Sequence, residues 1–296
     1  MKKSFHKPVL LKEVIEYLNI KAGEKYLDAT LGGGGHAQEI LKRGGKLLGI
    51  DCDPWAIEAA RGCLSSACPD ASWQLARGNF AHLKEIALEH GFAQVAGVLF
   101  DLGVSTYQLE TAERGFSFNL ECPLDMRMDP DLQVTAADLV NGLSENELKE
   151  IFTRFGEERY ARRLAGAIGR ARQIKPIKTA NQLAAIILKA WPRRGRFERI
   201  HPATRCFQAL RIAVNDELGN LRKALPQAGE LLKPKGRLVV ISFHSLEDRI
   251  VKRFFKEEEK EEKLRIITKK PIRPTEAEIN SNPRSHSAKL RVAEKI

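Results

Sequence analysis

The 296-residue chain is predicted to be an α/β protein with a doubly wound sheet and an inserted all-helical domain. Short apolar runs alternate with helical patterns over residues 25–101, as in sheets that helices cover on both faces. The alternation then stops, and residues 123–225 have helical patterns instead. It returns over residues 236–255 with one more strand and one more helix. We therefore expect a sheet domain that helices interrupt along the chain.

The first part of the sheet is predicted from four strands with helices between them. The expected strands are 25–30, 46–51, 72–76 and 95–101, and the expected helices are 37–43, 54–64 and 83–90, after a first helix at 9–20. Pro54 suits the first turn of a helix, where no hydrogen bond needs its missing N–H. The last of these strands is almost wholly apolar, which is typical of a strand buried on both faces of a parallel sheet.

The middle of the chain is predicted to be helical throughout, from residue 123 to about residue 188. Apolar spacing predicts helices at 136–141, 145–155, 159–172 and 180–189, and one or two long helices at 202–225. A strand at 236–242, a helix at 246–255 and a final strand at 288–293 complete the sheet domain. We accordingly place a discontinuous core at 1–110 and 206–296, and a helical, basic insertion at 111–205.

Positive charge is concentrated in the helical region. The chain has a formal net charge of +11, and residues 149–211 hold sixteen Lys and Arg residues against four Glu residues. Such a local excess favours a polyanion as the partner, with nucleic acid as the first candidate. Most of these cations are arginines, whose guanidinium forms a two-pronged contact with phosphate that Lys cannot form. A solvated helical face is the alternative interpretation.

Composition excludes several classes of protein. Hydrophobic residues make up 43% of the chain, which suits a sizeable core and excludes disorder for the bulk of it. No apolar run reaches the roughly 18–20 residues of a membrane helix, and residues 1–12 lack the apolar stretch of a signal peptide. We expect a cytoplasmic protein without a membrane partner. The five cysteines form no C-x-x-C pair, so we expect reduced thiols, no disulfide framework and no metal site.

Four consecutive glycines, residues 32–35, lie between a predicted strand and a predicted helix. In an open α/β sheet this turn lies at the carboxyl ends of the strands, where ligands bind. Glycines let the backbone approach a ligand closely, and the start of the helix offers free N–H groups. Asp51 ends the next strand, where its carboxylate can accept hydrogen bonds from both hydroxyls of a ribose. These features predict a cofactor that contains adenosine, with a tight turn that needs glycine as the alternative.

The identity of the cofactor depends on the second half of the fold. A nicotinamide dinucleotide is compatible with the loop, since Gly32, Gly34 and Ala37 fit the G-x-G-x-x-G/A pattern. It is disfavoured because helices replace the second nucleotide-binding half. The predicted last strand resembles the terminal reversed hairpin of S-adenosylmethionine-dependent methyltransferases. Asp28 resembles the acidic residue that contacts the methionine part of the cofactor there, whereas Thr30 replaces the glycine that is usual two positions later.

Six short motifs, in order along the chain, closely resemble one family. They are DATLGGGGH at 28–36, DLGVSTYQ at 101–108, ERGFSF at 113–118, PLDMRMD at 123–129, HPATRCFQALR at 201–211 and ISFHSLEDRIVK at 241–252. The family is that of the bacterial small-subunit (16S) ribosomal RNA cytosine-N4 methyltransferases, RsmH/MraW, and the resemblance covers essentially the whole chain. It implies a Rossmann-like class I S-adenosylmethionine methyltransferase sheet. It also implies methyl transfer to the exocyclic N4 amine of one cytidine in the decoding region of 16S RNA.

The resemblance further implies a binding site for S-adenosyl-L-methionine. Its residues are Gly34, Gly35, His36, Asp51, Phe80, Asp101 and Gln108. The residue types agree with this assignment at several positions. Asp51 suits the ribose, Phe80 can lie against adenine, and Asp101 faces the same edge of the sheet from the end of its strand.

Two residues are candidates for acting on the target amine. Asp101 is the first candidate for orienting the amine, and His244 is the second, with a structural hydrogen bond in a tight turn as the alternative for His244. The general amino-methyltransferase pattern has Pro-Pro-aromatic after the acid, whereas this chain has Leu-Gly-Val-Ser at 102–105. Cys206 is interpreted as a packing residue rather than a nucleophile, because it lies within a helical pattern.

RNA is the expected macromolecular partner. The target base must leave any stack to reach the methyl donor, and Phe116, Phe118 and Phe207 could stack on bases, although core packing is the expected role of Phe207. The arginines of the insertion would bind phosphates without reading sequence. We expect 16S RNA within the small ribosomal subunit as the substrate, and a homodimer through the helices of 136–172 is possible. A non-catalytic RNA-binding ribosome-assembly factor and an NAD-dependent oxidoreductase are the alternatives.

Overall fold

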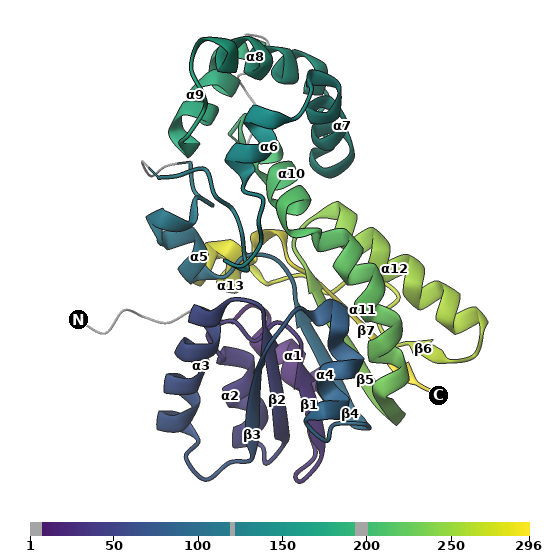
Figure 1. The fold of residues 1–296 in the computed structure, drawn as a ribbon. Coiled ribbons are helices and arrows are strands. Elements are labelled where there is room, and N and C mark those ends of the chain that lie inside the picture. The colour runs from purple at the N-terminus through teal and green to yellow at the C-terminus, as the bar shows by residue number, and fades with distance from the viewer. Residues whose placement is uncertain (1–7, 119–121, 193–200) are drawn as a thin grey trace. The chain divides into compact units, whose positions relative to one another are not determined.

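The structure, a computed structural model, describes residues 8–118, 122–192 and 201–296 (Figure 1). The chain forms two compact units. One comprises the chain up to Ser105 together with Leu218–Ile296, and the other comprises Thr106–Glu217. The first unit is therefore discontinuous in sequence, because the second is inserted between its two segments.

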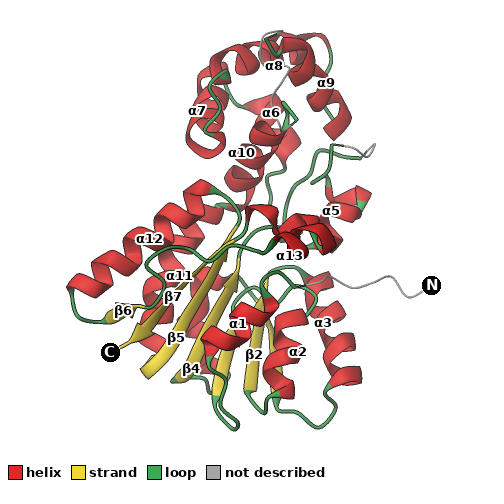
Figure 2. Ribbon diagram, turned by 180° about the vertical axis from the view of Figure 1, so that it is seen from behind, coloured by secondary structure: helices red, strands yellow, loops and turns green. Residues whose placement is uncertain are grey.

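The first unit contains a seven-stranded sheet with the strand order β3-β2-β1-β4-β5-β7-β6. Strands β1 to β5 pair in parallel, whereas β7 runs antiparallel between β5 and β6. The strands are β1 Lys25–Asp28, β2 Lys46–Asp51, β3 Trp73–Arg77, β4 Val95–Asp101, β5 Leu232–Ser242, β6 Leu264–Ile266 and β7 Lys289–Lys295. The predicted doubly wound α/β sheet with a reversed last strand is confirmed (Figure 2).

Helices cover both faces of this sheet. They are α1 Leu11–Leu18, α2 Gly35–Lys42 and α3 Pro54–Ala67 on one face, and α4 Leu83–Glu89, α11 Glu217–Leu231 and α12 Ser245–Lys260 on the other, with a short α13 at Glu276–Ser281. Each face of the sheet packs with its helices into a hydrophobic core, and alternate residues of β4 point into the two cores. Val98 and Phe100 pack with α4, α11 and α12, whereas Leu99 packs with α1, α2 and α3. Among the described residues, no helix combines the length and hydropathy that crossing a membrane requires.

The second unit is built from six α-helices and a short 3₁₀ helix, Ala112–Arg114, within its described residues. The α-helices are α5 Thr106–Glu110, α6 Ala136–Gly142, α7 Glu145–Gly156, α8 Ala161–Ile174, α9 Ala180–Ala190 and α10 Thr204–Asn215. Capping boxes begin α6, α7 and α9, with Thr135, Ser144 and Thr179 as the N-caps. Helix α7 packs against α8 and α10, and Phe152 of α7 is completely buried.

Residues 123–135 are not helical, which corrects the prediction of a helical region from residue 123 onward. Arg127 organises this segment. Its guanidinium makes a two-pronged ion pair with Asp125 and donates hydrogen bonds to the carbonyls of Pro130 and Leu132. These side-chain bonds give the backbone partners outside a helix, and Pro130 has no N–H to offer one. The apolar residues of the segment therefore pack from a loop.

The last strands also differ from their predicted bounds. Strand β5 begins at Leu232, ahead of the predicted start at residue 236. The strand is irregular around Lys235, whose φ is 66°, and the prediction covered only the regular part after this irregularity. The preceding Pro234 has the sequence signature of a turn. Strand β6 has only three residues, too few for an alternating pattern to predict it.

The buried Phe152 provides a test of the core of the second unit. Phe152→Ala is expected to lower the free energy of unfolding by about 3–5 kcal/mol, because the lost ring leaves a cavity. Ile174→Ala, at a side chain that is 90% exposed on α8, is the matched control and should change it by less than about 0.5 kcal/mol. Urea denaturation followed by circular dichroism measures both, and equal losses would contradict the assignment of Phe152 to the core.

Candidate functional site

The carboxyl ends of five parallel strands lie along one edge of the sheet. Strand order runs from β1 to β3 on one side and from β4 to β5 on the other, so the direction of the chain switches between β1 and β4. Ligands bind at such switch points in open α/β sheets. The glycine loop at 32–35 follows β1, Asp51 ends β2, and Asp101 ends β4. The three predicted features therefore share this edge.

The glycine loop has a backbone that only glycine adopts easily. Gly32 and Gly34 have φ values of +51° and +80°, in the left-handed region. A Cβ added to Gly34 would also lie 3.3 Å from Cβ of Ala60 on α3. Gly35 is the first residue of α2, and its added Cβ would lie 3.2 Å from Pro8. The loop therefore turns sharply between β1 and α2 and presents backbone rather than side chains at the edge.

Asp51 connects the glycine loop to the end of β2. Its Oδ2 accepts a hydrogen bond from the Gly32 N–H at 2.8 Å, and its Oδ1 accepts one from the Asp53 N–H at 2.9 Å. Each carboxylate oxygen has two lone pairs, so both oxygens retain capacity to accept from a ribose hydroxyl. Burial raises the pKa of Asp51 to about 6, although these backbone hydrogen bonds oppose the rise.

Asp101 is a buried acceptor next to His36. Nε2 of His36 lies 3.0 Å from the carbonyl oxygen of Val9, which can only accept, so the proton is on Nε2. Nδ1 of the same ring then faces Oδ2 of Asp101 at 3.6 Å. The other oxygen, Oδ1 of Asp101, is buried without a hydrogen-bond partner among the described residues. Burial, together with the charges of Asp28 and Glu247, raises the pKa of Asp101 well above its ordinary value.

Thr30 joins the ends of β1 and β4, a role that sequence analysis missed. Its hydroxyl accepts a hydrogen bond from the Asp101 N–H at 2.6 Å, and its own N–H donates to Oδ1 of Asp28 at 3.2 Å. Asp28 is 1% exposed, and burial, followed by the charge of Asp51, raises its pKa to about 7 against the Thr30 hydrogen bond. The signal in the sequence was Thr30 itself, a hydroxyl residue at a position where glycine is usual.

The two remaining predicted cofactor residues lie in different units. Phe80 follows β3 and begins the short 3₁₀ helix Phe80–His82, capped by the side chain of Asn79. Its ring packs edge-on against Phe100, with the centroids 5.8 Å apart. Gln108 is a buried residue of α5 in the second unit. The first unit thus contains six of the seven predicted residues, and five of them belong to the edge formed by β1, β2, β4 and α2.

His244 is the N-cap of α12. Its Nδ1 accepts a hydrogen bond from the Glu247 N–H at 3.4 Å, and Glu247 accepts in return from the N–H groups of Phe243 and His244. Its Nε2 lies 3.2 Å from Glu247 Oε1, without the alignment of a hydrogen bond. Both ring nitrogens therefore face the capping partner. A role of His244 at the target amine stays a prediction.

The aromatic residues proposed to stack on bases are mostly in the core. Phe207 is 5% exposed, which confirms its packing role, and Phe116 is 8% exposed, so the stacking expected of Phe116 is wrong for this conformation. Phe118 is half-buried, and its ring stacks on His201 with the centroids 4.6 Å apart. Cys206 is completely buried, and burial raises the pKa of its thiol well above the ordinary value, so it is a packing residue as predicted.

The basic region is only partly described. Arg193, Arg194, Arg196 and Arg199 lie outside the described residues. The described arginines Arg154, Arg159, Arg162, Arg163 and Arg170 are all exposed, on or near α7 and α8. These five arginines therefore face solvent, whereas Arg172, Arg205 and Arg211 are half-buried and bonded within the unit.

The residues at the sheet edge fit a cofactor that is positively charged and contains a ribose. Asp28 is a buried carboxyl group, Asp51 and Asp101 are partly buried ones, and within the described chain neither Asp28 nor Asp51 forms an ion pair. A sulfonium or ammonium group would relieve their mutual repulsion, whereas the pyrophosphate of a dinucleotide would add to it. The site therefore suits S-adenosylmethionine better than a nicotinamide dinucleotide.

Comparison with known proteins identifies sequences and structures that are similar to this chain. The model of the MraW methylase family matches residues 3–296. Ribosomal RNA small subunit methyltransferase H from Carboxydothermus hydrogenoformans is 49% identical over 307 residues, covering 98% of each chain. The protein of the same name from Geobacter sulfurreducens is 50% identical over 309 residues, covering 98% of this chain and 99% of its own. A proposed rRNA-methylase from Clostridium thermocellum, with a solved structure, is 14% identical with a TM-score of 0.51 and covers 98% of this chain and 100% of its own, a likeness of fold alone.

Asp28 provides a test of the buried charge. Its pKa near 7 in the native state exceeds the ordinary 3.8, so the native state binds more protons between these values and stability falls as pH rises through them. Asp28→Asn is expected to stabilise the cofactor-free protein by about 1–3 kcal/mol at pH 8, less at pH 5, and to weaken S-adenosylmethionine binding. Thermal unfolding at both pH values measures the first effect and isothermal titration the second. An equal gain in stability at both pH values would contradict the buried charge of Asp28 as the cause of the gain.

Two substitutions at His244 distinguish a helix-capping role of this residue from a catalytic role. Asn is also a preferred N-cap, so His244→Asn should keep both the stability and the rate of the predicted methyl transfer within about twofold if the ring only caps α12. His244→Ala should cost about 1 kcal/mol of unfolding free energy. Stability is followed by chemical denaturation and rate by single-turnover kinetics. A stable His244→Asn variant that has lost its activity would instead assign the imidazole to the reaction.

Proposed function

The chain belongs to the MraW methylase family, and from this membership we propose that it methylates the exocyclic N4 amine of a cytidine in 16S ribosomal RNA. S-adenosylmethionine is the methyl donor. The observation that carries the proposal is the family match over residues 3–296, which includes both the sheet edge and the basic helical unit. We also propose that the reaction takes place in the cytoplasm, where the predicted ribosomal substrate is found.

The cofactor would be held by the carboxyl edge of the sheet. Gly34, Gly35 and His36 would approach it from the loop and the start of α2, with Asp51 accepting from the ribose and Phe80 lying against the adenine. When bound, S-adenosylmethionine supplies an electrophilic methyl group on a sulfonium centre. Gln108, from the second unit, stays a predicted contact.

Asp101 is the residue that we assign to the target amine. The amine is a weak nucleophile because its lone pair is delocalised into the cytosine ring, and it must lose a proton as the new N–C bond forms. Oδ1 of Asp101 is a buried acceptor without a partner among the described residues, so it can accept the hydrogen bond of that N–H. The raised pKa of Asp101 increases the proton affinity of its carboxylate.

The assembled small ribosomal subunit is the substrate form that we favour. Arginines bind the RNA backbone and give affinity without choice of sequence, so selection of one cytidine needs the shape of a folded RNA or particle. The name of the relatives specifies the RNA of the small subunit. The homodimer through residues 136–172 stays a prediction.

The decisive experiment is transfer of labelled methyl groups to a natural substrate. Small subunits from a strain that lacks this gene are incubated with the protein and radiolabelled S-adenosylmethionine, and the label is located by nucleoside analysis. N4-methylcytidine at a single site supports the proposal. Cofactor binding without transfer, to particles or to free RNA, would favour an assembly factor, and binding of NAD instead of S-adenosylmethionine would favour an oxidoreductase.

Asp101→Asn tests the assigned role. The amide cannot take a proton, so the single-turnover rate at saturating cofactor and RNA is expected to fall about 10²–10⁴-fold. In the wild type the rate should rise with pH through the elevated pKa of Asp101, because the carboxylate must be ionised to accept. Asp70→Asn, at an exposed acid, is the control and should leave the rate unchanged. A flat pH profile with an active Asp101→Asn variant would remove Asp101 from the reaction.

A further inference from the structure

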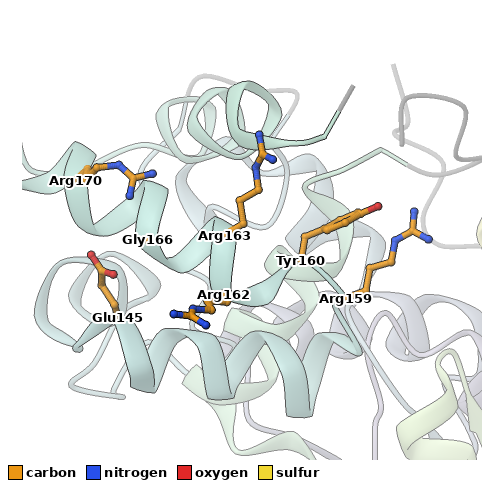
Figure 3. A pocket seen from close by; sticks show the side chains of 7 residues that line it. All are labelled: Glu145, Arg159, Tyr160, Arg162, Arg163, Gly166 and Arg170. Atoms are coloured by element: carbon orange, nitrogen blue, oxygen red, sulfur yellow. The ribbon is translucent and has the colours of Figure 1, made fainter. Parts of the chain in front are cut away.

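A hollow of about 540 Å³ lies on the second unit, between the start of α7 and the first turns of α8. Its lining residues are Glu145, Arg159, Tyr160, Arg162, Arg163, Gly166 and Arg170 (Figure 3). Four of the seven are arginines and one is an acid, so the lining carries a strong positive excess. The hollow lies wholly within this unit, and its description does not depend on the sheet edge.

The spacing of residues along α8 creates the hollow. Arg162, Gly166 and Arg170 are each four residues apart, so they lie on one face of the helix. Gly166 has no side chain and leaves a gap between the two arginines. A Cβ built on it would meet only the ends of flexible side chains, Arg170 Nη1 at 3.4 Å and Glu145 Oε2 at 3.5 Å. The two guanidinium groups thus flank a space whose floor is the backbone of α8 (Figure 3).

Three of the arginines around the hollow make no ion pair with the described residues, although the Glu145 carboxylate is part of the same lining. Arg162, Arg163 and Arg170 are exposed, and in the part of the chain that the structure describes none of them forms a hydrogen bond or an ion pair. Elsewhere in the same unit, by contrast, Arg127 and Arg211 form ion pairs with carboxylates. Guanidinium groups that line a hollow without an ion-pair partner among the described residues are available to an external anion.

An aromatic side chain lies beside the cations. Tyr160, which immediately precedes α8, is half-buried, and the guanidinium of Arg159 lies over its ring, 4.7 Å from the centroid. Trp191 packs edge-on against the same ring at 5.0 Å and supports it. Cations next to a supported aromatic ring are the combination that binds the backbone and bases of RNA. A hollow of this size exceeds what a single inorganic phosphate needs.

We propose that this hollow, between α7 and α8, is a binding site for the sugar–phosphate backbone of the RNA substrate, with Arg162, Arg163 and Arg170 as its phosphate ligands. The proposal rests on the proposed function for the identity of the RNA, but not for the presence of the site. Glu145 limits the affinity, because its carboxylate faces the same space. The site binds the backbone of the RNA and confers no choice of base.

The test compares two triple variants that lose the same charge. The first is Arg162→Gln, Arg163→Gln and Arg170→Gln. The control is Lys252→Gln, Arg253→Gln and Lys256→Gln, three exposed cations on α12. The probes are a fluorescein-labelled transcript of the 16S decoding region, followed by anisotropy at several KCl concentrations, and purified small subunits, followed by sedimentation. Thermal unfolding and S-adenosylmethionine binding of each variant are measured alongside to establish that it is folded.

The first variant should bind both probes about tenfold to a hundredfold more weakly, and its slope of log K against log [KCl] should be shallower by about 2–3. The control should stay within about threefold of the wild type. Glu145→Gln should bind more tightly, a gain that a merely structural role of the hollow would not produce. Equal affinities and slopes for the two triple variants, or a wild type that binds neither probe, would overturn the proposal.

Failure of this inference is distinguishable from failure of the proposed function. If the wild type methylates small subunits and the Arg162, Arg163 and Arg170 variant does so with unchanged KM, the hollow is not the anchor although the function stands. If the wild type binds RNA through these arginines but transfers no methyl group, the anchor stands and the proposed function fails.

Discussion

Burial of three carboxyl groups at neighbouring strand ends is the constraint on which the candidate site depends. Asp28, Asp51 and Asp101 end β1, β2 and β4, strands that are adjacent in the sheet and so hold the groups close together. Burial raises the pKa of all three. Folding must offset this cost, and the surrounding backbone does so in part, since Thr30 donates to Asp28 and Gly32 donates to Asp51. What remains is an edge with surplus acceptors and negative charge, which suits a cationic ligand that carries hydrogen-bond donors.

The rigidity of that edge comes from the two apolar cores that enclose the sheet. Consecutive residues of β4 enter opposite cores, so Asp101 at its end cannot shift without disturbing both. The contact from Thr30 to the Asp101 backbone then fixes the spacing of β1 and β4 at the switch point. Asp101 ends β4 and Thr30 lies in the turn directly after β1, whose neighbours Ala29 and Leu31 donate hydrogen bonds to β4 and β2. This is a favourable arrangement for a site that must align a methyl donor with an amine.

The second unit has its own helix caps and its own apolar core. Capping boxes begin three of its helices, and Phe152 is completely buried in its interior. The exposed arginines of α8 are not needed for these contacts. The separation of charge that is visible in the sequence thus has a structural counterpart: the sheet edge is acidic and buried, whereas the helical unit is basic and exposed.

The sequence by itself determined most of the helices and strands, the order in which they follow one another along the chain, and the residue types at the carboxyl edge of the sheet. These follow from local periodicity, from glycines that permit positive φ, and from an acid at the end of a strand. It also indicated that Cys206 and Phe207 pack in a core. It could not show that residues 123–135 form a loop, because the bonds of Arg127 that hold it depend on the folded chain.

Only the tertiary structure decided which side chains meet. Thr30 and Asp101 are 71 residues apart, and their contact depends on the register between β1 and β4. The capping role of His244 likewise depends on how α12 begins. The hollow between Glu145 and the arginines of α8 depends on how α7 and α8 pack. Local pattern fixes which face a residue occupies, but distances between faces are set by packing, which no single segment of sequence contains.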